Sequence, residues 1–175
     1  MSIEELTLAY PWSGYSNKLK DRISNPMSAG IITPEEANSR KMRLVIGQEG
    51  SLQEENLVKF FLMVDPEEGT IVESKFQAFG QSALIGMAEA ICEFLIGKNY
   101  DQACHLNVNI LEHFLRDKNE ESSFPFIFEG YAGLVIDAVI KAANECKDIP
   151  LADTYVSPMP EVQPGNSKGY PGWKE

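Results

Sequence analysis

The feature that most constrains this fold is a pair of strand-like segments joined by a tight turn. Residues 57–64 (LVKFFLMV) are almost entirely apolar, and residues 70–79 resume after the turn Asp65-Pro66-Glu67-Glu68-Gly69. Pro66 fixes φ and Gly69 tolerates a positive φ, so the segments are predicted to form an antiparallel hairpin. Alternation in the second arm predicts one covered face and one solvated face. We place Val72, Ser74, Phe76 and Ala78 on the covered face, and Ile71, Glu73, Lys75 and Gln77 on the solvated face.

Other segments complete a small α+β fold around this hairpin. Residues 42–46 are predicted to form a strand, whereas the glycines and polar residues of 47–56 predict a loop or bulged edge. Residues 81–96 carry apolar side chains at helical spacing and stop before Gly97, which predicts the longest buried helix. Further helices are predicted over residues 15–24, 100–105, 107–115 and 130–144. The predicted class is α+β, with a small three-stranded antiparallel sheet and helices packed on one face.

The composition divides the chain into three parts. Residues 1–14 are predicted to be an N-terminal extension and residues 15–149 a single domain. Residues 150–175 contain five prolines and three glycines and lack the apolar side chains needed for a core. We expect this Pro/Gly-rich tail to be extended, and to be pinned only where Tyr170 and Trp173 find a surface.

Charge and cysteine usage exclude several classes of partner. The net charge of −11 disfavours nucleic acid, because binding to phosphates depends on positive charge. No apolar run approaches the roughly 20 residues that cross a bilayer, and Glu4 and Glu5 stand near the start, so we expect a cytoplasmic protein without a membrane partner. Cys92, Cys104 and Cys146 are spaced neither as a disulfide framework nor as a metal knuckle, and are expected to be reduced thiols.

Four local features of the segment 64–103 form a recognisable combination: the hairpin turn, Lys75 to Gly80 running into Ser82-Ala83, Ile96-Gly97-Lys98, and Asp101-Gln102-Ala103. With them, this segment resembles the central part of NifU/IscU-type iron-sulfur cluster assembly scaffold proteins, of the NifU N-terminal domain type. The tyrosine-initiated segment Tyr15 to Pro26 and the pair Gly50-Ser51 extend the likeness over residues 15–144. The resemblance implies the α+β fold of that family and a role in cluster assembly.

The cluster-binding positions of that family hold no cysteine in this chain. The family's Cys-Gly-Asp loop corresponds to Glu54-Glu55-Asn56, and its Phe-Gly-Cys-Gly turn to Phe79-Gly80-Gln81-Ser82. The third cysteine, with its neighbouring histidine, falls within Glu129, Gly130 and Tyr131. Clusters are held by thiolates, so carboxylates and amides are poorly matched ligands. Glu55 and Ser82 also replace glycines, which removes freedom for close backbone approach. We therefore expect a degenerate member with no catalytic, cofactor-binding or metal-binding residues and no cofactor.

Three functions remain open, and we favour the first. The chain is expected to be a non-enzymatic protein-binding or regulatory module that acts on a cysteine desulfurase or another cluster-assembly protein, as a monomer or homodimer. Alternatively, Glu49, Glu54 and Glu55 gather near Glu129 and bind iron or zinc weakly through carboxylates. The third possibility is a structural domain that dimerises through the solvated sheet face or the tail, unrelated to iron-sulfur metabolism.

Overall fold

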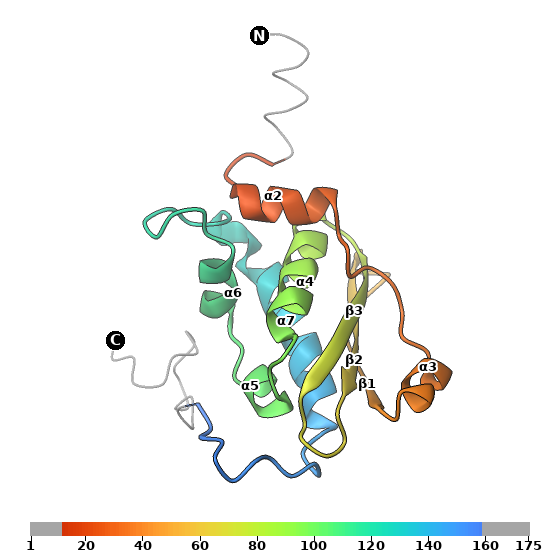
Figure 1. Cartoon of the computed structure of the whole chain (residues 1–175). Helices are drawn as coiled ribbons and strands as arrows, with labels where there is room; N and C mark the ends of the chain where they lie inside the picture. Colours follow the sequence, from red (N-terminus) through yellow and green to blue (C-terminus); the bar gives the residue numbers. More distant parts are fainter. Residues whose placement is uncertain (1–11, 159–175) are drawn as a thin grey trace, which may run out of the picture.

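An antiparallel sheet of three strands in the order β1-β2-β3 lies at the centre of the molecule (Figure 1). A computed structural model describes residues 12–158. The strands are β1 (Arg43–Ser51), β2 (Asn56–Val64) and β3 (Ile71–Phe79). Asp65 and Thr70 close the β2–β3 turn through a backbone hydrogen bond of 2.8 Å from the amide of Asp65. The predicted hairpin is therefore confirmed.

Helices α4 and α7 cover one face of this sheet. The core between them contains Phe60 and Leu62 from β2, Leu84 and Ile91 from α4, and Val139 from α7, all fully or almost fully buried. The predicted fold class, an α+β fold with a three-stranded antiparallel sheet, is confirmed. The helices are α2 (Asn17–Ser24), α3 (Pro34–Ser39), α4 (Ser82–Leu95), α5 (Tyr100–Cys104), α6 (Val108–Phe114) and α7 (Glu129–Asn144), with a 3-10 turn η1 (Phe126–Phe128) before α7.

Two elements differ from the sequence prediction. β1 continues without interruption through residues 47–51, which were predicted as a loop or bulged edge, because all five of these residues pair with β2. Backbone pairing does not require apolar side chains, so the glycines and polar residues there did not reveal the strand. Helix α3 was not predicted, although Thr33 caps it through a hydrogen bond from the amide of Glu36 and Pro34 occupies its first position.

A β-bulge changes which residues of β3 face the helices. Val64 pairs with Ile71 and Met63 pairs with Glu73, so Val72 is the extra residue. Ile71 is consequently buried on the helix-covered face, whereas Val72 packs with Met63 on the other face. The predicted faces of Ile71 and Val72 are therefore wrong. The second face is also partly covered, by a small cluster of Ile32, Ala37, Phe61 and Met63.

The described part of the tail, residues 150–158, contains no helix or strand. It is nevertheless fixed to α5, because the hydroxyls of Tyr155 and Ser157 donate hydrogen bonds of 2.8 and 2.7 Å to the Asp101 carboxylate. Tyr170 and Trp173, the predicted anchors, lie outside the described residues. Within residues 12–158, no helix has the length and apolar character needed to span a membrane.

Candidate functional site at the ligand-loop end

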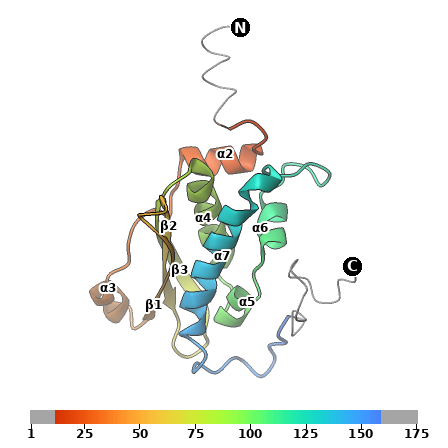
Figure 2. The ribbon, with the colours of Figure 1, turned by 180° about the vertical axis from the view of Figure 1, so that it is seen from behind.

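Three segments meet at one end of the molecule, which we call the ligand-loop end: the β1–β2 loop (52–55), the β3–α4 turn (79–82) and the start of α7 (126–131). Figure 2 shows the loop and the start of α7 at the same end, near α2. Gly80 has φ of +142°, and a Cβ there would stand 2.7 Å from both Asn56 Oδ1 and the carbonyl oxygen of Glu55. The first two ligand segments of the family are thus in direct contact.

A hollow of about 290 Å³ connects the first segment with the third. Glu54 and Asn56 line it from the β1–β2 loop, and Gly130 and Tyr131 line it from α7. Gln81 and Glu129 are not among its lining residues, and both are exposed. Four of the six predicted positions therefore come together, while Gln81 stands as the N-cap of α4 without a side-chain capping bond.

The β1–β2 loop keeps a glycine-like backbone although it contains no glycine at the matching position. Glu55 has φ of +57°, in the left-handed region that glycine adopts most readily. Hydrogen bonds hold the turn: the Glu54 amide donates to Ser51 Oγ at 3.2 Å, and the Glu55 amide donates to the Leu52 carbonyl at 3.2 Å. Glu55 thus adopts, with a full side chain, a backbone conformation that glycine takes most readily.

Aromatic rings pack beside residues 129–131, the third ligand segment. Phe128 packs edge-on against Tyr15 with ring centroids 5.5 Å apart, and stacks on Tyr131 at 5.7 Å. Burial raises the pKa of the Tyr15 phenol. Tyr15 and Phe128 were not predicted to belong to the site, although the aromatic run FPFIF over residues 124–128, directly before residues 129–131, was a visible signal.

The donor atoms at this end do not fit an iron-sulfur cluster. Glu54 and Gln81 offer a carboxylate and an amide oxygen where the family has thiolates, and the neighbouring Asn56 adds only an amide. Asn56 Oδ1 is buried and accepts no hydrogen bond within the described chain. Glu49, which was expected to join a carboxylate group, forms an ion pair with Lys141 instead. Over residues 12–158, no group of three or more His, Cys, Asp or Glu side chains is arranged to hold a metal ion.

The three cysteines lie away from the ligand-loop end. Cys92 is buried within α4, where Ser74 Oγ donates to its sulfur at 3.1 Å, and burial raises its thiol pKa. Cys104 donates to Asn144 Oδ1 at 3.5 Å near the other end of α7. Burial raises the pKa of the Cys146 thiol to about 11. Burial also raises the pKa of the partly exposed Cys104 thiol, so all three sites disfavour the thiolate form that binds metals.

Exposed apolar side chains stand on the same three segments, and Ile127 among them lines the hollow. Phe126 and Ile127 of η1 are 81% and 77% exposed, although both are large apolar residues. Leu52 of the β1–β2 loop and Phe79 at the end of β3 are also exposed. We call these four residues the apolar rim. They come from all three ligand segments at this end of the molecule.

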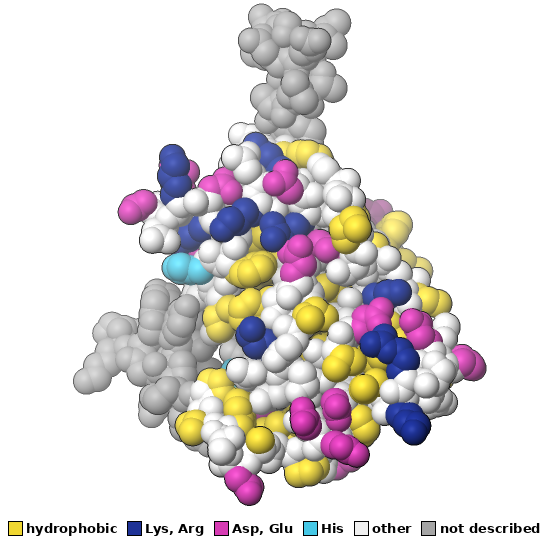
Figure 3. All heavy atoms as spheres, in the orientation of Figure 1, with side chains coloured by type: hydrophobic (Ala, Val, Ile, Leu, Met, Phe, Trp, Pro, Cys, Tyr) yellow, Lys and Arg dark blue, Asp and Glu magenta, His cyan; other side chains and the backbone are white. Residues whose placement is uncertain are grey.

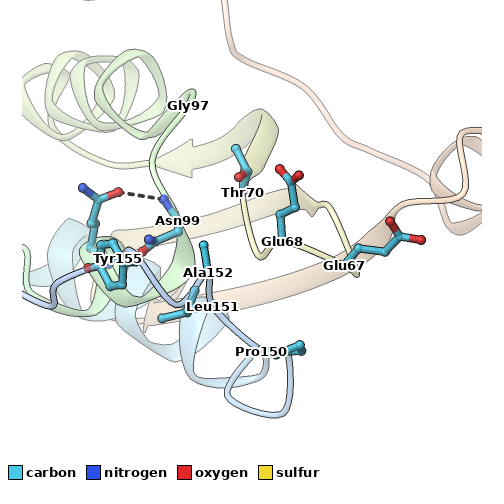
Figure 4. A pocket seen from close by; sticks show the side chains of 10 residues that line it. Glu67, Glu68, Thr70, Gly97, Asn99, Pro150, Leu151, Ala152 and Tyr155 are labelled. Carbon is cyan, nitrogen blue, oxygen red and sulfur yellow. Dashed lines mark hydrogen bonds between the residues drawn. The ribbon is translucent and has the colours of Figure 1, made fainter.

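A second hollow, of about 400 Å³, lies at the opposite end of the molecule (Figure 4). The start of the tail, with Leu151 and Tyr155, faces Glu67 and Glu68 of the β2–β3 turn across it. Beside this hollow, the Asn99 amide donates to Gln102 Oε1 at 2.9 Å, as part of the cap of α5. Among the described residues that line this second hollow there is no cysteine or histidine.

On the surface that carries α4, acidic groups lie near hydrophobic side chains (Figure 3).

Comparison with known proteins agrees with this geometry. Residues 14–125, more than half of the chain, match the family described as NifU-like N terminal domain. The chain is 35% identical over 101 residues to a nitrogen fixation protein NifU of Azotobacter chroococcum mcd 1, covering 58% of this chain and 30% of that protein. It is 31% identical over 90 residues to NifU of Azospirillum brasilense, covering 51% and 26% respectively. The match thus spans about a third or less of these relatives.

A solved structure shares the fold. A candidate iron-sulfur cluster assembly scaffold protein of the SUF system from Fervidobacterium islandicum AW-1 aligns with a TM-score of 0.51 and 16% identity, covering 74% of this chain and 96% of that one. Together, the three-stranded sheet with its covering helices and the three converging ligand segments define a scaffold-type domain. The chain belongs to the NifU-like N-terminal domain family.

Proposed function

We propose that this chain is a non-enzymatic, cytoplasmic protein-binding module of iron-sulfur cluster assembly that holds no cluster itself. It acts on a cysteine desulfurase or another assembly protein through the ligand-loop end. The observation that carries this proposal is the donor set: the backbone loops converge, yet Glu54, Gln81 and residues 129–131 offer no thiol or imidazole. A scaffold without thiolates retains its shape while losing its cargo site.

The apolar rim supports binding to a protein. Four large apolar side chains from three separate segments remain in solvent at one end of a strongly acidic molecule. Burial of such side chains contributes about 25 cal/mol per Å², and exposed apolar residues gathered around a hollow are typical of interaction sites. The expected partner surface is apolar at its centre, and basic where it meets Glu54, Glu55 and Glu129.

Cluster loading tests the first part of the proposal. The protein is purified without oxygen, after expression with iron and sulfide available, and its iron, acid-labile sulfide and visible absorption are measured. We expect a colourless protein without cluster absorption between roughly 320 and 420 nm, because thiolate ligation is missing. A brown preparation with stoichiometric iron and sulfide would show that the chain is a working scaffold.

Partner binding tests the second part. The untagged chain is titrated into a cysteine desulfurase from the same source, and the dissociation constant is measured by calorimetry. Ile127→Asp should weaken binding on the order of tenfold or more, because a carboxylate would be buried in the apolar rim. The matched control is Val156→Asp, since Val156 is 85% exposed and lies in the tail. Equal effects of both variants, or no binding by the parent, would contradict the proposal.

A further inference from the structure

The two edges of the sheet differ in how they are covered. On the β3 side, the Gly30 amide donates to the Phe76 carbonyl at 2.8 Å, and the Phe76 amide donates to the Ser28 carbonyl at 3.1 Å. The segment before α3 therefore occupies that edge. β1 forms the opposite edge, and α7 packs on its inner face (Figure 2). An edge strand of nine residues exposes backbone groups that favour pairing with another strand.

The pairing pattern identifies the outward groups of β1. The backbone amide and carbonyl of Phe76 form hydrogen bonds at the outer edge of the sheet. The backbone amides and carbonyls of the odd-numbered residues of β3 therefore point toward β2. The register through β2 gives the same alternation in β1. The backbone amides and carbonyls of its odd-numbered residues point toward β2, and those of its even-numbered residues point outward. The outward residues are Leu44, Ile46 and Gln48. In the described chain, the one hydrogen bond from outside the sheet to their backbone groups is donated by Lys141 Nζ to the Gln48 carbonyl, at 3.4 Å.

Charge is distributed unevenly along this edge. Three basic residues, Arg40, Lys41 and Arg43, stand at the start of β1, while three acidic residues, Glu49, Glu54 and Glu55, stand at or beyond its end. The edge is thus electrically balanced, although the chain carries a net charge of −11. A second β1 in antiparallel orientation would place each basic end opposite an acidic end, whereas a parallel copy would place like charges together.

We propose that β1 pairs with β1 of a second copy of this chain, antiparallel about a two-fold axis at Ile46, to form a continuous six-stranded sheet. In this register Ile46 faces the partner's Ile46, and Leu44 faces the partner's Gln48 as hydrogen-bonded pairs. Arg43 faces the partner's Glu49. Ile46 is 43% exposed in one chain and loses this exposure in the dimer. This interface goes beyond the proposed function.

The charged pairs fit the same arrangement. Arg43 already donates to the Asp148 carboxylate at 2.8 Å, and Lys141 forms an ion pair with Glu49 in its own chain. Pairing of Arg43 with the partner's Glu49 therefore joins two existing ion pairs into one network. The pair occurs twice, because a two-fold interface repeats every contact.

Oligomeric state gives the first test. The full chain is measured by light scattering on a sizing column and by sedimentation velocity over a concentration series. We expect a dimer, and Ile46→Lys should raise its dissociation constant about tenfold or more, because two ammonium groups would face each other across the axis. Gln77→Lys is the control, since Gln77 is exposed on β3 away from the proposed interface. A monomeric parent protein, or equal effects of both variants, would overturn the proposal.

Directed disulfides test the register, in a Cys104→Ser background that removes the partly exposed native thiol. Ile46→Cys should oxidise to a covalent dimer, because Cα atoms of a hydrogen-bonded pair lie about 5.5 Å apart, within the range of a disulfide. Leu44→Cys alone should not, because its counterpart lies four residues along the strand, about 13 Å away. Mixing Leu44→Cys with Gln48→Cys should yield a mixed dimer. Efficient cross-linking of Leu44→Cys to itself, or none by Ile46→Cys, would exclude this register.

Discussion

The helix-covered face of the sheet and the ligand-loop end differ in what holds them together and in how their side chains compare with the family's. On the helix-covered face, buried apolar side chains such as Leu84 and Ile91 maintain the packing of α4 against the sheet. At the ligand-loop end, the backbone is maintained by strand pairing, by Gly80 and by the left-handed conformation of Glu55. The side chains there, however, no longer match the family's ligands. Backbone position and chemical function are thus specified by different residues.

The largest expected effect is on the helix-covered face. Ile91→Ala or Leu84→Ala should lower the free energy of unfolding by about 2–5 kcal/mol, because each removes a fully buried side chain and leaves a cavity. Ile127→Ala is the control at the ligand-loop end and should cost less than about 0.5 kcal/mol, because Ile127 is largely in solvent. Denaturant titration gives both values. Similar losses for the core and rim variants would show that the two regions are not energetically separate.

Restored thiolates test whether the ligand-loop end has kept its geometry. Starting from Glu54→Cys with Gln81→Cys, a third cysteine at Gly130 or Tyr131 should raise zinc affinity on the order of 100-fold, because a more complete thiolate site binds better. A third cysteine at Glu129 is the control, since Glu129 is exposed and does not line the hollow. Competition with a chromophoric chelator measures the affinities. No difference between the three triple variants would mean that the loops do not converge on one ion.

A smaller effect is expected from the strained backbone at Glu55. Glu55→Gly should raise the stability by about 0.5–1 kcal/mol, because a left-handed conformation costs roughly 1–2 kcal/mol for a residue with a Cβ, partly offset by the entropy of glycine. Glu54→Gly is the neighbouring control and should be neutral or destabilising, since its φ is not positive. Thermal unfolding compares the two variants. A loss of stability in Glu55→Gly would contradict the role assigned to its backbone.

The smallest effect concerns a buried carboxylate on α4. Burial raises the pKa of Glu89, which accepts hydrogen bonds from the amide and hydroxyl of Ser28. The protonated form is therefore favoured in the folded state, and its stabilising contribution is lost as the pH rises above 4.5 through the folded-state pKa. Glu89→Gln should gain stability relative to the parent over that range, by less than about 1 kcal/mol at pH 7. Urea titrations at several pH values measure the difference, and a difference that shrinks with rising pH would contradict this assignment.

The strongest sequence patterns predicted the core correctly. The apolar run of β2 and the helical spacing of α4 each reflect a face that is buried along its whole length, so the side chains themselves carry the signal. Helix α3 was missed although Thr33, Pro34 and the acidic residues after them form a recognisable helix start. The sequence therefore contained the signal for α3, although the helix was not predicted.

Other features depend on contacts between distant segments. Residues 47–51 form a strand because β2 pairs with them, and Gly47 is needed because a Cβ there would stand 1.9 Å from the Ala138 carbonyl oxygen of α7. The bulge at Val72 reversed two predicted side-chain directions. By itself, the sequence determined the buried stripes and the loss of thiolates, because these follow from residue type and spacing. Only the tertiary structure decided the register, the close approach of α7 and the hollow at the ligand-loop end, because these depend on which backbones meet in space.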